Sequence, residues 1–531
     1  MNKPTDFDLL LTNGILVDGS GNDPVKGDIA FKDGRIAAIG DLSGSRAGQS
    51  LDCAGLNIAP GFIDTHTHSD AYILLEPAAP SKTWQGVTTE ILGHCGASAA
   101  PYSIPECLSS DWRTFEYPGS WGSMGEYRDL LESRGFGPNL VALAGHRNLR
   151  IAVMGVESRP ATRAEIKQMA DLLAESFAEG ASGFSTGLIY EPSKNATPEE
   201  VEALARVTRE HGGVYTTHIR NESSRLLEAL DEAIDIARQT GVALQISHLK
   251  TAGRANWHFV EEAVAKINAA RAAGLRVYAD RYPYTASGTT LGILLPNWAK
   301  KDGHEAILNR LRDPATRARI VAEMDGINNA EQRGEIIVAA TWSDQTHPFR
   351  GQSLYKAAAQ LGMTAVEACL WILEQDKLLT SAFYVSMSED NLRYIYSQPW
   401  VMLGSDGSIR NTTGLLSQDH PHPRAYGANA RLLAMSREEG GLSLAETVRR
   451  MSSLPAEAFG IDERGWLKTG YWADVVVFNA ATVRDRATFA EPHQLSEGVE
   501  HVFVNGQAIL QDSALTGKLP GKWVQSKIIQ E

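Results

Sequence analysis

Apolar residues gather in short runs along the middle of the chain, and stretches with helical spacing separate these runs. Short apolar runs predict buried strands, while Leu226, Leu230 and Ile234 repeat along one face of a predicted helix. The eight runs lie at residues 62–63, 86–91, 140–144, 181–184, 213–217, 243–247, 276–279 and 400–403. Eight strands alternating with helices predict an α/β fold of the (β/α)8 TIM barrel class.

One helix has a clear start signal after the fourth run. Thr197 is expected to be the N-cap, Pro198 occupies the first helical position, and Glu200 is expected to complete a capping box.

The two ends of the chain have a different pattern of apolar and polar residues from the middle. Residues 7–58 contain short alternating strands between Gly, Asn and Asp turns, and similar strands return at 473–478 and 501–506. We therefore expect residues 1–58 and 467–531 to form one small β-domain, and residues 59–466 to form the barrel.

The gap between the seventh and eighth runs is too long for one crossover helix. Residues of about 288–350 contain a helical stretch of their own, Glu305 to Leu311, and predict an inserted subdomain. Leu294, Leu295 and Trp298 could cover a substrate, so we expect this subdomain to be a lid that excludes water.

Composition and charge narrow the class of partner. The chain has 531 residues and a formal net charge of −14, and it has no basic run that would attract nucleic acid. No stretch approaches the roughly 20 apolar residues of a membrane-spanning helix, and the first residues lack a signal-peptide pattern. The four cysteines form no CxxC pair, which argues against a disulfide framework or a zinc knuckle. We expect a cytoplasmic protein that acts on a small molecule, with neither nucleic acid nor membrane as partner.

Metal-binding residue types follow the predicted strands. In a barrel of this class the residues at the carboxyl ends of the strands form the active site. His66 and His68 lie two residues apart on an extended chain and so face the same side. The full set of candidate metal ligands at strand ends is His66, His68, Cys95, His218, His248 and Asp406. Imidazole and thiolate ligands favour zinc over magnesium or calcium.

These residues carry a resemblance to a known family. Residues 60–68, PGFIDTHTH, resemble the opening motif of the amidohydrolase superfamily, whose members are metal-dependent hydrolases with a (β/α)8 barrel and a flanking β-sandwich. The chain is more specifically similar to the D-aminoacylases, or N-acyl-D-amino-acid deacylases. The segments that match this subgroup lie at residues 86–90, 95–98, 145–150, 187–192, 217–222, 282–286, 404–407, 422–424 and 470–474.

The resemblance implies roles for the candidate ligands. Cys95, His218 and His248 would hold a tight zinc ion, and His66, His68 and a bridging Cys95 would form a weaker second site. Asp406 would be the general acid and base. The fourth strand end, residues 182–187, contains no lysine that could bridge two metals by carboxylation, which leaves Cys95 as the available anionic bridge. The chain departs from the subgroup at His94, where asparagine is usual, and at residues 427–431.

An N-acyl amino acid carries a carboxylate, which cationic and hydroxyl side chains would bind. The candidates are Lys250, Tyr190, Arg424, Tyr284 and Ser287, and the resemblance favours Arg424, Lys250 and Tyr190. Arg220 is expected to pair with Glu222 or Asp280 as structural support, and His146 to orient a neighbouring group.

Two alternatives to an N-acyl-D-amino-acid deacylase stay open at this point. A hydrolase of the same superfamily could act on another amide, a cyclic amide, a lactone or a carbamate, because a fold does not fix its substrate. A non-catalytic barrel scaffold would have lost ligands, whereas all six are present here.

Overall fold

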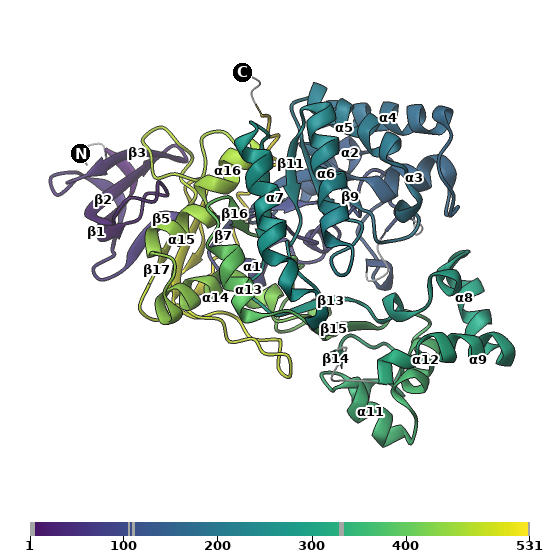
Figure 1. The fold of residues 1–531 in the computed structure, drawn as a ribbon. Coiled ribbons are helices and arrows are strands. Elements are labelled where there is room, and N and C mark those ends of the chain that lie inside the picture. Colours follow the sequence, from purple (N-terminus) through teal and green to yellow (C-terminus); the bar gives the residue numbers. More distant parts are fainter. Residues whose placement is uncertain (1–5, 105–106, 109–111, 329–333, 529–531) are drawn as a thin grey trace.

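The computed structural model describes residues 6–104, 107–108, 112–328 and 334–528. Its centre is a parallel sheet of eight strands in the order β16-β12-β11-β10-β9-β8-β7-β6 (Figure 1). These strands are β6 (Phe62–Asp64), β7 (Val87–Leu92), β8 (Asn139–Gly145), β9 (Gly183–Gly187), β10 (Val214–His218), β11 (Ala243–Ile246), β12 (Val277–Arg281) and β16 (Val401–Leu403). Each of the eight predicted runs contributes one strand.

The first and last strands of this sheet meet, so that it nearly closes into a barrel. The Thr65 hydroxyl donates to the Leu403 carbonyl over 2.7 Å, and the Asp406 amide donates to the His66 carbonyl over 2.8 Å. The predicted (β/α)8 barrel is therefore confirmed, and its strand ends bring distant parts of the sequence together.

Helices surround the barrel, most of them amphipathic and buried on one side. They are α1 (Pro80–Thr83), α2 (Met124–Arg134), α3 (His146–Met154), α4 (Arg163–Ala178), α5 (Pro198–Glu210), α6 (Leu226–Thr240), α7 (Val260–Ala272), α13 (Glu389–Tyr396), α14 (Arg424–Glu439), α15 (Leu444–Met451) and α16 (Ser453–Phe459). Helix α5 begins as expected, with Thr197 as N-cap and Pro198 in its first turn. Glu200 does not complete a capping box, because its carboxylate turns inward to the buried Arg150 and His146.

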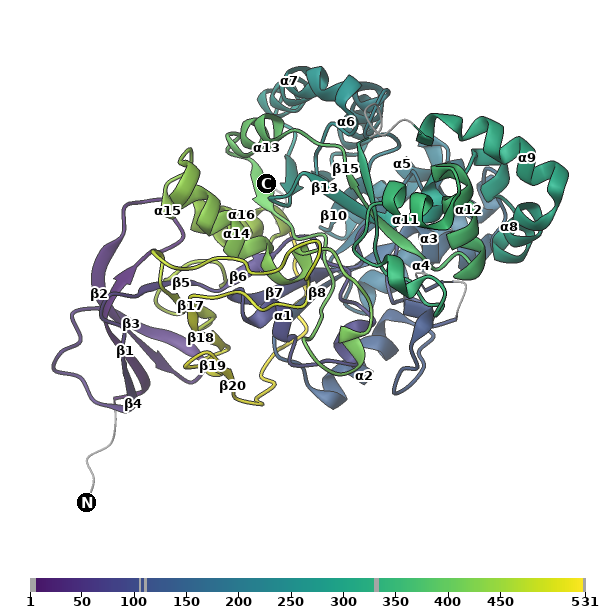
Figure 2. The same ribbon diagram turned by 90° about the horizontal axis from the view of Figure 1, so that it is seen from below.

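Strands from both ends of the chain share one nine-stranded sheet beside the barrel (Figure 2). Strand β17 from the carboxyl-terminal part pairs with β5 from the amino-terminal part, and a separate apolar core that includes Phe31 and Val477 fills this domain. The strands are β1 (Phe7–Leu16), β2 (Val25–Lys32), β3 (Arg35–Gly40), β4 (Ala47–Asp52), β5 (Asn57–Pro60), β17 (Val475–Phe478), β18 (Val499–Val504), β19 (Gln507–Gln511) and β20 (Ala514–Leu515).

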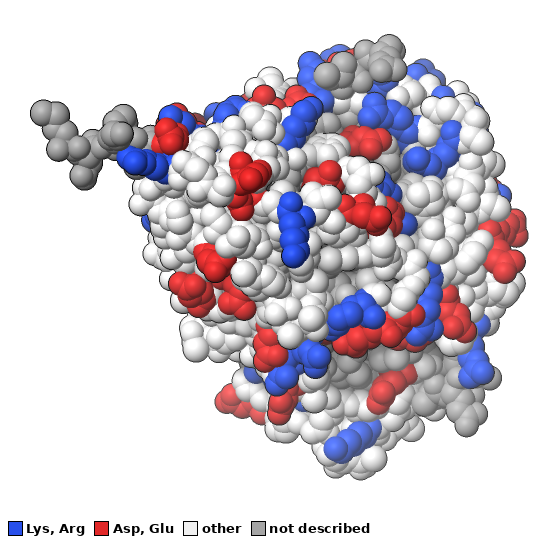
Figure 3. Space-filling model, turned by 90° about the vertical axis from the view of Figure 1, so that its left-hand side faces the viewer, with Lys and Arg blue, Asp and Glu red and all other residues white. Residues whose placement is uncertain are grey.

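Two segments of the carboxyl-terminal part extend from this sheet and contact the barrel. Asp485 and Phe489, between β17 and β18, contact Tyr284 and His422 from the barrel. After β20, the Val524 amide donates to the Leu140 carbonyl over 2.8 Å, so the last described residues pack along the barrel. Figure 3 shows acidic and basic side chains interspersed over one face of the molecule.

The insertion between the seventh and eighth barrel strands forms a lobe to one side of the barrel (Figure 1). Its elements are β13 (Ala286–Thr290), α8 (Gly303–Arg312), α9 (Pro314–Glu323), β14 (Glu335–Val338), α11 (Leu354–Leu361), α12 (Ala365–Gln375) and β15 (Ser381–Val385). Its own apolar core continues to Ala382, beyond the expected end near residue 350. Leu295 is buried in this core, and Leu294 and Trp298, which are partly buried, pack against it.

Among the described residues, no helix combines the length and the apolar character needed to cross a bilayer.

Candidate metal centre

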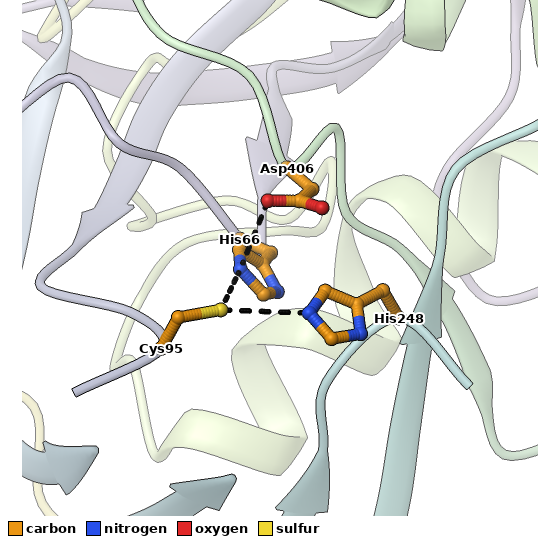
Figure 4. A group of neighbouring side chains, drawn as sticks. All are labelled: His66, Cys95, His248 and Asp406. Atoms are coloured by element: carbon orange, nitrogen blue, oxygen red, sulfur yellow. Dashed lines mark hydrogen bonds and ion pairs between the residues drawn. The ribbon is translucent and has the colours of Figure 1, made fainter. Parts of the chain in front are cut away.

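Four candidate ligands lie together at the carboxyl ends of their strands. His66 follows β6, Cys95 follows β7, His248 follows β11 and Asp406 follows β16, and their side chains point toward one another (Figure 4). Their ligand atoms all lie within 4.8 Å of one another. The barrel thus gathers groups that are more than 300 residues apart in the sequence.

The distances around the Cys95 sulfur fit a metal ion. Cys95 Sγ lies 3.4 Å from His66 Nε2, 3.6 Å from His218 Nδ1 and 3.4 Å from His248 Nε2. A tetrahedral zinc ion, with Zn–S of about 2.3 Å and Zn–N of about 2.0–2.1 Å, holds sulfur and nitrogen about 3.5–3.6 Å apart. Each of these three sulfur–nitrogen distances is therefore close to the one that a zinc ion shared by the two atoms imposes.

The other nitrogen of each histidine faces a carboxylate. His66 Nδ1 lies 3.1 Å from Asp280 Oδ2, His248 Nδ1 lies 2.9 Å from Glu222 Oε1, and His218 Nε2 lies 3.4 Å from Glu222 Oε2. A carboxylate that accepts the N–H of one nitrogen leaves the other nitrogen unprotonated and able to bind a metal. Asp280 can therefore accept the proton of His66 and leave Nε2 facing Cys95. Glu222 places its negative charge beside the outer nitrogens of His218 and His248, of which His218 Nε2 makes no hydrogen bond and His248 Nδ1 also lies 2.8 Å from the Lys250 ammonium.

Burial sets the protonation of these groups. It lowers the pKa of His66 well below its usual value and that of His218 to about 3, so both imidazoles are neutral at neutral pH. Burial, with a further contribution from Asp406, raises the pKa of the Cys95 thiol well above its usual value. A cation in this position would stabilise the thiolate, which is the form that binds metal.

Asp406 lies at the edge of this group and has several cationic or polar neighbours. Its Oδ1 is 3.1 Å from His68 Nε2, and its Oδ2 is 2.8 Å from an Arg424 guanidinium nitrogen. Burial raises the pKa of Asp406, but the charge of Arg424 and the hydrogen bond with His68 outweigh burial and hold this pKa well below its usual value. Asp406 is therefore an ionised carboxylate that could accept a proton.

The backbone is strained at three of these residues. Cys95, His248 and Asp406 have φ values of 54°, 38° and 50°, in the left-handed region that non-glycine residues rarely adopt. Space is also tight, because a Cβ added at Gly187 would lie 2.1 Å from the Cys95 carbonyl oxygen. Such conformations concentrate at functional sites, where the surrounding structure holds them.

The two other histidines near the cluster have different surroundings. His68 faces Asp406 and lies outside the compact group of ligand atoms. The His94 ring stacks on His66 with centroids 4.1 Å apart, and neither of its buried nitrogens has a hydrogen-bond partner.

The candidates for substrate binding surround the same site. The Lys250 ammonium bonds to Glu222, and Arg424 pairs with Asp406. The Tyr190 ring lies 5.0 Å from the His218 ring, and its hydroxyl hydrogen-bonds Thr289 of the insertion.

The other two candidates for substrate binding, Tyr284 and Ser287, lie shortly after β12. The Tyr284 hydroxyl donates to Asp485 over 3.3 Å, and the Tyr284 ring packs against His422. Ser287 lies on β13, paired with Tyr384 of β15.

Two expectations about polar groups had different outcomes. Arg220 pairs with Glu232, not with Glu222 or Asp280, because its guanidinium turns toward helix α6. His146 pairs with Glu200 over 2.8 Å, beside Arg150.

Sequence reasoning did not identify Glu222 and Asp280 as members of the site. Glu222 follows His218 by four residues, and Asp280 lies in the seventh strand, so their positions at strand ends were the available signal. Only the barrel shows which histidine each carboxylate accompanies.

Comparisons with known proteins agree with this geometry. A profile of the amidohydrolase family matches residues 49–510. The chain is 38% identical over 504 residues to N-acyl-D-glutamate deacylase of Alcaligenes xylosoxydans xylosoxydans, covering 95% of this chain and 93% of the relative. It is 36% identical over 522 residues to D-aminoacylase of the same organism, covering 97% of each chain.

A solved structure is similar throughout. It is N-acyl-D-glutamate deacylase from Bordetella bronchiseptica in complex with zinc and a phosphonate inhibitor that mimics the tetrahedral intermediate. The two chains share 35% sequence identity with a TM-score of 0.84, over 98% of this chain and 100% of the other.

Proposed function

The chain belongs to the amidohydrolase family, and we propose that it is a zinc-dependent deacylase that hydrolyses the linear amide bond of N-acyl-D-amino acids. The products would be a carboxylate and a free D-amino acid. The convergence of three imidazole nitrogens on Cys95 Sγ, with the Asp406 carboxylate beside them, carries the proposal. The substrate class is supported by the two relatives named N-acyl-D-glutamate deacylase and D-aminoacylase, which match this chain over nearly its full length.

The residues present fit a zinc ion. Cys95, His218 and His248 would hold one tightly, and His66, His68 and the shared Cys95 would hold a weaker second one. Bound zinc supplies a water of lowered pKa and polarises the carbonyl that is attacked.

Asp406 would move the proton in this reaction. Its low pKa keeps it ionised, so it accepts the proton of the attacking water and then returns it to the leaving nitrogen. Amide cleavage needs this return, because an unprotonated amine anion is a poor leaving group. The Arg424 and His68 side chains hold the two oxygens of Asp406 in place.

The substrate carboxylate would bind among the cationic and hydroxyl groups around the site. Arg424 and Lys250 are nearly buried, and both already pair with carboxylates of the chain. A substrate carboxylate would therefore join existing ion pairs. Tyr190, Tyr284 and Ser287 would add hydroxyl donors.

We propose further that the insertion closes over the bound substrate. It reaches the site through the hydrogen bond of Thr289 to Tyr190 and through the contact of the Phe383 ring with His422, whose centroids are 5.1 Å apart. Closure would exclude water from the reacting groups.

The test is a substrate panel on protein of measured zinc content. N-acetyl amino acids of both enantiomers, including neutral and acidic side chains, are assayed beside a hydantoin and a lactone. We expect hydrolysis of the D-enantiomers only, and its loss in Cys95→Ala. Preferred hydrolysis of the hydantoin or the lactone would refute the deacylase assignment, and equal rates on both enantiomers would refute the D-specificity.

A further inference from the structure

The sequence predicts Glu222 only as a possible partner of Arg220, but its side chain contacts several groups of the proposed metal centre. It lies in the loop after β10, and its side chain is only 11% exposed. One carboxylate oxygen lies 2.9 Å from His248 Nδ1 and also accepts from the Lys250 ammonium, while the other lies 3.4 Å from His218 Nε2. A single carboxylate therefore spans two of the three histidines around Cys95.

The two histidines present different nitrogens to the sulfur. His218 faces Cys95 with Nδ1, whereas His248 faces it with Nε2. A neutral imidazole has one protonated nitrogen, and only the other can bind a metal. The Glu222 carboxylate lies on the side of each ring where the proton has to be, 2.9 Å from His248 Nδ1 and 3.4 Å from His218 Nε2. The His218 contact lacks hydrogen-bond geometry, so it is the negative charge of Glu222 that favours a proton on both of these nitrogens.

Glu222 could instead form a second cation site with His218 and His248, because these three residues also lie close enough to hold an ion. The chain already places a cation there. The Lys250 ammonium bonds to Glu222 and lies 2.8 Å from His248 Nδ1. An ammonium only donates, so Lys250 cannot accept the Nδ1 proton of a metal-binding His248, and the Glu222 carboxylate is the neighbouring group that can.

We propose that Glu222 is a positioning residue that fixes the tautomer and orientation of His218 and His248 together, and thereby sets the affinity of the centre for zinc. The inference rests on the proposed zinc site and is independent of the substrate. Carboxylates that orient metal-binding histidines typically contribute about 10–100-fold to metal affinity or activity. We expect Glu222 to lie in this range, because it serves two ligands.

The experiment measures zinc affinity in metal-free protein by competition with a chromophoric chelator. Glu222→Gln keeps the size of the side chain but removes its charge, and Glu222→Asp keeps the charge on a shorter side chain. Glu200→Gln is the matched control, because Glu200 is also a buried carboxylate between a histidine and a cation, with no contact to Cys95 among those the structure shows. Cobalt substitution reports through the thiolate charge-transfer band whether Cys95 remains a ligand.

We expect zinc binding to weaken by about 10–100-fold in Glu222→Gln, and by less in Glu222→Asp, with the cobalt–thiolate band retained. Glu200→Gln should bind zinc within about threefold of wild type even if its melting temperature falls. Wild-type affinity in Glu222→Gln, or an equal loss in Glu200→Gln, would overturn the proposal. If Glu222→Gln does not fold, a loss of at least threefold in Glu222→Asp supports it and an unchanged affinity overturns it. Failure of the wild-type protein to bind zinc would instead refute the proposed function.

Discussion

Replacing the buried Lys82 by methionine should destabilise the protein strongly and disturb Asp406. Lys82 lies in α1 with its side chain fully buried, and its ammonium donates to Asp64 over 2.8 Å, to the Ser405 hydroxyl over 2.8 Å and to the Gly407 carbonyl over 3.1 Å. Two of these partners flank Asp406 in the sequence. The ammonium thus joins the first and last strands beneath the proposed acid and base.

The size of the effect follows from burial. Methionine has nearly the shape of lysine, so the cavity term is small, but the Asp64 carboxylate is left buried without its cation. Removing one partner of a buried ion pair typically costs about 3–5 kcal/mol. Lys167→Met is a control, because its i,i+4 pair with Asp171 is 65–75% exposed and such pairs contribute about 0.3–0.5 kcal/mol.

Urea denaturation of the metal-free proteins, followed by tryptophan fluorescence, measures both variants under the same conditions. We expect the Lys82→Met transition at a clearly lower urea concentration and that of Lys167→Met near wild type. Adding Asp64→Asn to Lys82→Met should recover part of the loss, because the unpaired charge is then removed. A Lys82→Met variant within about 1 kcal/mol of wild type would refute this account of the network.

Four further predictions concern the centre and its surroundings. Cys95→Ala and His218→Ala should each lose bound zinc in metal analysis, and full zinc content in both would contradict the ligand assignment. Asp406→Asn should keep the fold and most of the zinc but lower kcat at least about 10²-fold, and turnover within a few-fold of wild type would assign the proton transfer to another group. Arg424→Ala should raise KM for an N-acyl amino acid, and this increase should exceed the increase for the corresponding acylated amine, which lacks a carboxylate, by about 10-fold or more. Equal losses on both substrates would make Arg424 purely a partner of Asp406. Burial raises the pKa of Glu90 from 4.5 to about 7, so the folded chain binds more protons than the unfolded chain between these pH values. The stability of the folded chain therefore falls as pH rises through this range. The melting temperature of Glu90→Gln relative to wild type should rise from pH 5 to pH 8, and a constant difference would contradict this.

The barrel was predictable from the sequence because its strands are buried on both faces, and several of them are therefore continuous apolar runs. Short runs such as residues 140–144 stand out from the amphipathic helices between them, and the ligand types that follow such runs reveal the functional end of the barrel. The end of the insertion was harder to locate, because α11 and α12 have the apolar spacing of barrel helices and pack in a different core.

Pairings between polar groups were the least predictable part. Arg220 has several carboxylates within reach of its long side chain, and only the placement of helix α6 selects Glu232. The contact of Arg424 with Asp406 depends likewise on how the loop after β16 returns to the barrel. Sequence spacing fixes neither distance.

The left-handed backbone at Cys95, His248 and Asp406 has a consequence for mutation. Each such conformation costs a non-glycine residue about 1–3 kcal/mol, and glycine would adopt it with little cost. A mutation to glycine at these positions therefore relaxes the fold while it removes a ligand or the proton carrier. Stability alone would favour glycine at these positions, so the strained backbone is a cost that the fold bears for the side chains it carries there.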